Sequence, residues 1–119
     1  MANYSFQRNS RITSRDDFRR ILDKNQRRVC DYFVALWEAA PATDSTLQLG
    51  IITSRKLGGA VTRNAIRRRI RESFRQLAPG YAGVGGKLIL IGRQRSKHAS
   101  INELTNKLNW VLRSCRQLS

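Results

Sequence analysis

The chain has 119 residues, which suits one domain with one modest hydrophobic core and is too short for two domains. Its 23 lysines and arginines against 8 acids give a formal net charge of +15. The positive charges repel one another in the folded chain, which predicts a polyanionic partner. A membrane surface is the competing polyanion, but the sequence has no apolar run of about 18 residues and no signal-peptide core. We therefore expect a single cytoplasmic domain over residues 1–119 that binds nucleic acid and no membrane.

The first predicted element is a short helix that follows a polar, irregular start. Residues 1–10 have no periodic pattern, and we expect them to be mobile until RNA binds. Ser14 followed three residues later by Asp17 is a variant of the capping box, and Phe18 and Leu22 then lie one turn apart. The pattern predicts a helix that begins after Ser14 and ends near Lys24.

Two strands are predicted next. The chain from Arg27 to Ala40 is rich in aromatic and β-branched residues, which favours one extended segment closed by Pro41. Alternate side chains of this strand point to opposite faces, and both sets are apolar. They are Tyr32, Val34 and Leu36 on one face, and Phe33, Ala35 and Trp37 on the other. Burial on both faces and contact with a ligand on one face both fit this pattern. A second strand over residues 47–53 is predicted to pair back antiparallel.

A strongly basic helix is predicted over Ala60 to Leu77, between the pair Gly58-Gly59 and Pro79. At about 100° per residue its apolar residues fall within one narrow arc, as expected for a face that meets a core. They are Ile66, Ile70, Phe74 and Leu77. The neighbouring arc holds Asn64, Arg67, Arg68, Arg71 and Arg75, with Arg63 at the seam.

A solvated face is the ordinary explanation of a charge run. Residues 54–75, however, hold eight basic residues and one acid, Glu72. A solvated helix usually intersperses acids, whereas adjacent arginines repel one another unless phosphates lie between them. We therefore interpret this arc as a nucleic-acid contact. The glycine and lysine order does not match a Walker loop, so we expect no nucleoside triphosphate and no small-molecule substrate.

The last third of the chain predicts a loop, a strand and a helix. Glycines punctuate residues 81–86, and residues 87–92 form an apolar run typical of a central strand covered on both faces. Ser100 and Glu103 form a full capping box. The helix that follows has one apolar face, made of Ile101, Leu104, Leu108, Val111, Leu112 and Cys115. Trp110 falls on the opposite side, and we interpret it as incidental, with a contact point as the alternative.

The residues that could support catalysis or metal binding are few. The acids are scattered over separate elements, and His98 stands alone next to Lys97. Cys30 and Cys115 form neither a C-x-x-C pair nor a metal-ligand set, so we predict free buried thiols. A protein nuclease needs paired carboxylates for metal or a histidine with a partner. We therefore predict no catalytic residues, no metal ligands and no cofactor bound by the protein alone.

The order of residues in the basic helix resembles the signature of the protein subunit of bacterial ribonuclease P. The pattern Arg-Asn-x-x-Arg-Arg-x-x-Arg, preceded by a strand and Gly-Gly, is carried by Arg63, Asn64, Arg67, Arg68 and Arg71. The flanking chain is similar to the family from about Arg11 to Arg116. One departure is Ala65, where the family often has arginine. Either one RNA contact is missing here, or Arg69 supplies it.

The resemblance implies a fold and a function. The implied fold is α+β: a single domain with a mixed four-stranded sheet, three helices and a left-handed βαβ crossover (ribosomal protein S5 domain 2-like). Handedness alone would favour the opposite, because about 98% of such crossovers are right-handed. The implied function is that of the non-catalytic subunit of an endoribonuclease ribonucleoprotein in tRNA processing. In that family the RNA subunit carries out hydrolysis with Mg²⁺, and the protein helps to bind precursor tRNA.

The resemblance also implies two RNA-contacting surfaces. The first faces the catalytic RNA and comprises Arg55, Lys56, Arg63, Asn64, Arg67, Arg68, Arg71 and Arg75. The second is a cleft between the first helix and the sheet that holds the 5′ leader of precursor tRNA, lined by Phe18, Leu22, Val34 and Leu36. The family often has aromatic residues at the positions of Leu22 and Leu36, so we expect weaker base stacking here. A ribosomal or other structural RNA-binding protein, or a helix-turn-helix DNA-binding protein, would carry similar charge, but the order of the motif favours ribonuclease P.

Overall fold

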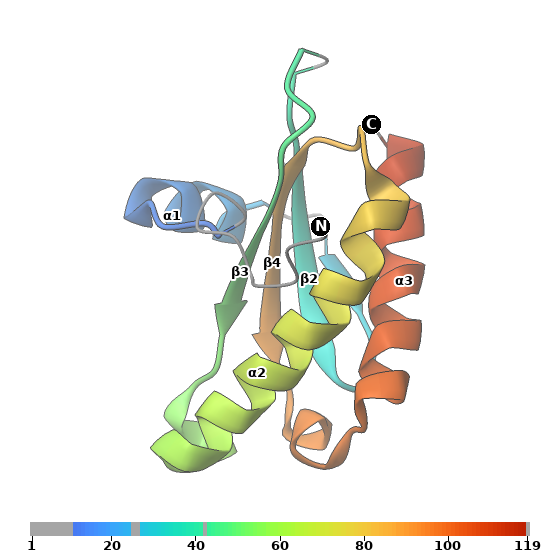
Figure 1. Cartoon of the computed structure of the whole chain (residues 1–119). Coiled ribbons are helices and arrows are strands. Elements are labelled where there is room, and N and C mark those ends of the chain that lie inside the picture. The colour runs from blue at the N-terminus through green and yellow to red at the C-terminus, as the bar shows by residue number, and fades with distance from the viewer. Residues whose placement is uncertain (1–10, 25–26, 42, 119) are drawn as a thin grey trace.

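The fold is built on a mixed four-stranded sheet with helices on both faces (Figure 1). The computed structural model describes residues 11–24, 27–41 and 43–118, so the prediction for residues 1–10 lies outside the described residues. The elements are α1 (Arg15–Leu22), β1 (Arg27–Val29), β2 (Phe33–Ala39), β3 (Leu47–Ile52), α2 (Ala60–Leu77), β4 (Gly86–Gly92) and α3 (Ile101–Leu118). Short 3₁₀ turns also lie between these elements: η2 (Arg55–Leu57), η3 (Ala78–Tyr81) and η4 (Gln94–His98).

The strand order across the sheet is β1-β2-β4-β3. β2 pairs antiparallel with both β1 and β4, while β3 pairs parallel with β4. In Figure 1, β3 and β4 both point downwards and α2 passes in front of the sheet as the chain moves from left to right. The crossover is therefore left-handed, against the general preference, and the implied fold class is confirmed.

Two predictions about the strands were wrong. The segment from Arg27 to Ala40 is not one strand, because a turn at residues 30–32 separates β1 from β2, and the Cys30 N–H donates to the carbonyl of Phe33 over 3.0 Å. β3 does not pair antiparallel with β2, because β4 lies between them. β2 and β4 are the two inner strands of the sheet, and inner strands are the ones that can be covered on both faces.

Two hydrophobic clusters lie on opposite faces of the sheet. The larger joins the apolar sides of α2 and α3 to Phe33, Ala35 and Trp37 of β2. The smaller joins Ile21 of α1 to residues from the other face, including Leu36. β2 is thus buried on both faces, which was one of the two alternatives for its apolar pattern, and β4 is covered on both faces as predicted.

The helix boundaries follow local signals. The Ser14 hydroxyl accepts from the Asp17 N–H at 3.3 Å, and α1 begins at the next residue. α3 has the complete capping box, with Ser100 N donating to the Glu103 carboxylate at 3.0 Å and Glu103 N donating to the Ser100 hydroxyl at 3.1 Å. α2 has the predicted bounds and follows Gly58, whose φ of 137° suits glycine.

The two thiols are free and buried, as predicted. Burial raises the pKa of the Cys115 thiol to about 12, so this side chain stays protonated in the core.

Candidate nucleic-acid interface

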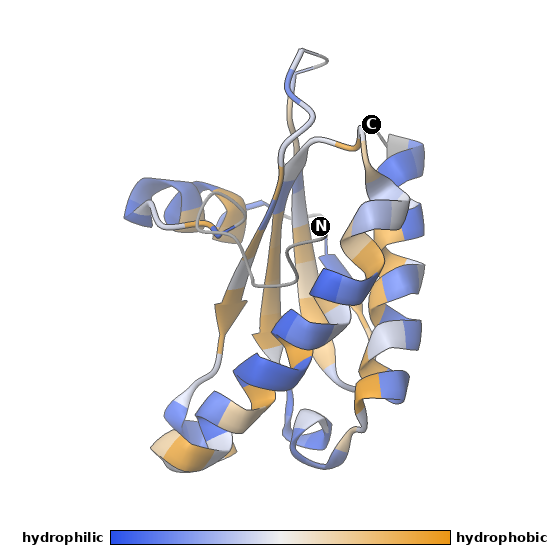
Figure 2. Cartoon of the chain, in the orientation of Figure 1, coloured by the Kyte–Doolittle hydropathy of each residue, from blue (hydrophilic) through white to orange (hydrophobic). Residues whose placement is uncertain are grey.

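The basic arc of α2 is turned away from the core. Ile66, Ile70 and Phe74 are at most 2% exposed, whereas Asn64 and Arg68 are exposed on the neighbouring side. Figure 2 shows this side as a hydrophilic stripe along α2. The other motif cations, Arg63, Arg67 and Arg71, are half-buried. Among the described residues, none of the four motif arginines forms an ion pair.

The cations of this arc repel one another. The pKa of Arg71 is lowered, first by partial burial and then by the positive charges of Arg11 and Arg67. Asn64 moderates the crowding through its side-chain oxygen, which accepts from Arg67 Nη2 at 2.6 Å. An anion bound beside these guanidinium groups would relieve the repulsion, so the charges of the arc favour binding of phosphate.

Two arginines of α2 have other roles. Arg69 Nη2 donates to the carbonyls of Ser96 and Lys97 at 2.9 and 3.1 Å, and so ties η4 to the helix. This engagement favours the first of the two alternatives for Ala65, that one RNA contact is missing here. Arg75 donates through Nε to Glu72 at 2.9 Å and through Nη2 to the same carboxylate. Of the predicted RNA-binding arginines, it is the one that forms an ion pair within the described residues.

η2 adds two cations at the N-terminal end of α2. Arg55 and Lys56 are exposed. The next residue, Leu57, is only 2% exposed and anchors the turn in the core. The Lys56 carbonyl accepts from Gln94 Nε2 at 2.8 Å. Since η4 is also tied to α2, the two turns hold these cations beside the basic arc.

α1 crosses the other face of the sheet and covers Leu36. Ile21, Leu36 and Ile89 are all 0% exposed, so Leu36 lies beneath the helix and does not line an accessible cleft. The assignment of Leu36 to the cleft was wrong, because α1 sits directly over the middle of β2. Phe18 and Leu22 are half-buried at the margin of the same cluster.

An apolar row crosses the whole sheet beside α1. The register aligns Val29 with Val34, Val34 with Ile91, and Ile91 with Ile52, so one residue from each strand takes part. Val34, Ile52 and Ile91 are half-buried against the α1 cluster, and Val29 is 55% exposed. We call this set the apolar row. Strand alternation could have identified Ile52 and Ile91, but only once the pairing of β3 and β4 was known.

Pockets open along α1 on the side of Phe18. One, of about 420 Å³, is lined by Arg15, Phe18, Arg19, Leu22 and Asp23. Another, of about 130 Å³, is lined by Arg11, Ile12, Phe18, Leu49, Gly50, Ile51 and Arg71. Phe18 lines both, and the second pocket reaches Arg71 of α2. The apolar margin of α1 and the basic arc of α2 thus meet at one aromatic ring.

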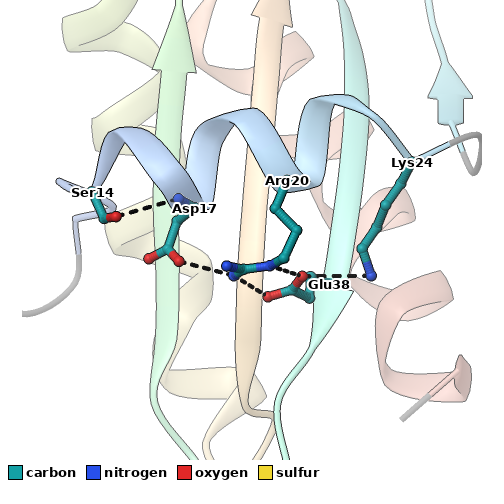
Figure 3. Close-up of polar contacts among 5 residues, drawn as sticks. All are labelled: Ser14, Asp17, Arg20, Lys24 and Glu38. Atoms are coloured by element: carbon teal, nitrogen blue, oxygen red, sulfur yellow. Dashed lines mark hydrogen bonds and ion pairs between the residues drawn. The ribbon is translucent and has the colours of Figure 1, made fainter.

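The opposite side of α1 is held by ion pairs (Figure 3). Arg20 donates to both carboxylate oxygens of Glu38 at 2.7 Å, and to Asp17 at 2.9 Å. Lys24 lies 3.5 Å from the same Glu38 carboxylate. The Arg20 guanidinium lowers the pKa of Glu38 below its ordinary value. These contacts fix the orientation of α1 and leave its other side, with Phe18, next to the pockets.

The described ranges contain no group of three or more His, Cys, Asp or Glu side chains placed to hold a metal ion. Several acids in these ranges have structural partners: Glu38 and Asp17 with Arg20, Glu72 with Arg75, and Glu103 in its cap. None of the helices, in the part of the chain that the structure covers, is long and apolar enough to span a membrane.

Comparison with known proteins agrees with this geometry. The model of the Ribonuclease P family matches residues 6–116. The ribonuclease P protein component of Macrococcus caseolyticus is 35% identical over 103 residues, 87% of each chain. The RNase P protein of Staphylococcus aureus superposes with a TM-score of 0.72 at 34% identity, covering 87% of this chain and 93% of that one. The RNase P protein of Thermotoga maritima superposes with a TM-score of 0.71 at 29% identity, covering 86% of this chain and 94% of that one. This chain therefore belongs to the family of bacterial ribonuclease P protein components.

Proposed function

We propose that this chain is the RNA-binding subunit that helps the catalytic RNA of ribonuclease P to remove the 5′ leader from precursor tRNA. One observation carries the proposal: Phe18 lines both the pocket along α1 and the pocket that reaches Arg71. A strand of RNA could therefore pass from an apolar, aromatic margin to a basic helix without leaving the surface. Single-stranded RNA is bound by this combination of stacking groups and cations.

The leader would lie along α1 and the apolar row. Its bases would contact Phe18 and Leu22, and its phosphates would approach Arg15 and Arg19, which line the same pocket. The floor of this groove would be Val34, Ile52 and Ile91. Leu22 offers no π-face, so we expect fewer stacked bases than an aromatic residue there would allow.

The basic arc of α2, with Arg55 and Lys56 of η2, would contact the catalytic RNA and stabilise the holoenzyme. The support is electrostatic: the four motif arginines have no ion pairs among the described residues, and the charged form of Arg71 is destabilised by partial burial and by its positive neighbours. Phosphates of a folded RNA would remove that repulsion and release counterions.

The RNA subunit would carry out hydrolysis with Mg²⁺. The residues of this chain do not fit a resident metal site, because the described part offers no cluster of ligands. Two of its acids are also already in ion pairs: Glu38 with Arg20, and Glu72 with Arg75. The protein would bind and orient RNA and leave the scissile phosphate to the RNA.

Reconstitution tests this proposal. Precursor tRNA is incubated with Mg²⁺ and the purified chain, the catalytic RNA, or both, and the 5′ ends are mapped. We expect no cleavage by the chain alone and faster 5′ processing by both than by the RNA alone. The Arg67→Ala, Arg68→Ala double variant should give less of this acceleration, because these side chains belong to the basic arc and lie outside the core. Cleavage at the 5′ junction by nuclease-free chain alone would overturn the assignment of chemistry to RNA.

A further inference from the structure

A second basic surface lies at the opposite edge of the sheet from η2. β3 and β1 are the two edge strands, and η2 follows β3. α3 lies near β1, where Arg28 contacts Trp110. We call this region the α3 surface, and it consists of Arg28 of β1 with Lys107, Trp110 and Arg113 of α3. All four are exposed. Trp110 lies at the centre and keeps 42% of its surface exposed.

The sheet register explains why Arg28 faces α3. Arg28 pairs with Ala35, which belongs to the cluster beneath α2 and α3. The Arg28 side chain therefore points to the helical side of the sheet, and its guanidinium carbon lies over the Trp110 ring, 5.8 Å from the centroid. This contact orients the indole by a cation–π interaction. Trp110 nevertheless keeps 42% of its surface exposed, so part of the indole remains accessible to a ligand.

The cations around the indole have no acidic partners in the described part of the chain. Lys107 and Arg113 lie one turn to either side of Trp110. The acid of α3 is Glu103, two turns away, and its carboxylate accepts from the Tyr32 hydroxyl at 2.7 Å as well as from its cap. The ion pairs that the structure describes do not involve Arg28 or the α3 cations.

We propose that the α3 surface binds an unpaired nucleotide of RNA, with its base stacked on Trp110 and its phosphates next to Arg28, Lys107 and Arg113. An aromatic platform inside a cationic rim is the arrangement that captures single-stranded RNA regardless of sequence. A protein partner would instead need a contiguous apolar patch, and the neighbours of Trp110 on its helix face are polar: Asn106, Lys107, Arg113 and Ser114. That the ligand is RNA rests on the proposed function, whereas the site itself rests on the contacts described above.

Trp fluorescence tests it directly, because the chain has two tryptophans in contrasting places. Trp37 is 9% exposed in the core, so it serves as an internal reference. The probe is an unstructured oligouridylate of about eight nucleotides, within the usual site size of such surfaces. We expect saturable quenching for the wild-type chain and for Trp37→Phe, and none for Trp110→Phe. Quenching should persist in Phe18→Ala, which alters only the groove beside α1.

A charge-matched pair of variants separates a local contact from general attraction. Arg28→Gln and Arg95→Gln each remove one positive charge near this edge, but Arg95 pairs with Asp31 at 3.6 Å and has no described contact with the indole. We expect Arg28→Gln to weaken the quenching titration several-fold more than Arg95→Gln. Trp110→Ala should weaken binding of the catalytic RNA roughly 5- to 150-fold, the range for one stacked base.

The outcomes distinguish this proposal from the proposed function. Absence of quenching, or equal effects of Arg28→Gln and Arg95→Gln, refutes the α3 surface even if the reconstituted complex still processes precursor tRNA. Quenching that is lost in Trp110→Phe supports it even if reconstitution fails, and in that case the proposed function is what fails.

Discussion

Gly50→Ala is the substitution whose effect the structure specifies most closely. Gly50 lies in β3 on the face that α1 covers, and a Cβ at this position would lie 2.6 Å from Phe18 Cζ and 2.8 Å from Cε1. Carbon atoms in contact prefer a separation of about 3.5–4.0 Å, so the ring must move by about 1 Å. The absence of a side chain at Gly50 is thus what allows Phe18 to rest on the strand.

The magnitude follows from where the ring can go. Overpacking a core typically costs about 1–3 kcal/mol. Phe18 is half-buried beside two pockets, so its ring can swing outward, and we expect about 1 kcal/mol of lost unfolding free energy. In a Phe18→Ala background the conflict is gone, and alanine should then stabilise the strand by about 0.5–1 kcal/mol relative to glycine. The two sites should therefore be coupled by roughly 1.5–2 kcal/mol.

Chemical denaturation of the wild-type chain, both single variants and the double variant measures this coupling. The slopes of the unfolding free energy against denaturant should agree among the four, which shows that they unfold alike. Additive effects, with a coupling below about 0.3 kcal/mol, would show that the ring does not rest on Gly50 and that the margin of α1 is misplaced.

Three further predictions concern the charged residues. In Arg67→Ala with Arg68→Ala, each lost phosphate contact should flatten the slope of log K against log salt for catalytic RNA by roughly 0.7–0.9, and an unchanged slope would place these side chains in solvent. Arg69→Met should cost about 1.5–3 kcal/mol of stability in a melt because it removes hydrogen bonds to η4, yet leave that slope unchanged; a flatter slope would make Arg69 an RNA contact. Arg20 lowers the pKa of Glu38 from its ordinary value of 4.5. The stability that this ion pair gives the fold is therefore present above pH 4.5 and is lost as the pH falls through the lowered pKa. The difference in unfolding free energy between wild-type and Glu38→Gln should accordingly shrink in acid, and a difference that grows would contradict the ion pair.

Helices were predictable because their signals are local. The bounds of α2 and the capping box of α3 depend on residues a few positions apart, such as Gly59 before Ala60, or Ser100 with Glu103. The basic and apolar arcs of α2 likewise follow from helical periodicity, and the family signature pointed to the same side chains.

The sheet was less predictable because strand pairing is not local. The turn at residues 30–32 has no glycine or proline to mark it, so β1 and β2 were merged. Sequential strands usually pair, but β3 pairs with β4, which begins at Gly86, 34 positions after β3 ends at Ile52. The apolar row cannot be assembled without that register. Leu36 was misassigned for the same reason, since only the position of α1 decides which residue of β2 it covers.

The affinity of the reconstituted holoenzyme for precursor and mature tRNA tests the central claim most directly, with wild-type chain and with Phe18→Ala compared side by side. Phe18 should contact the leader, so its loss should weaken precursor binding by about 1–3 kcal/mol if a base stacks on the ring. Mature tRNA has no leader, so its affinity should stay unchanged. A thermal melt checks that the variant remains folded, because loss of a fully buried phenylalanine would cost about 3–5 kcal/mol of stability. Equal loss of affinity for both tRNAs in a folded variant would contradict a leader path along α1.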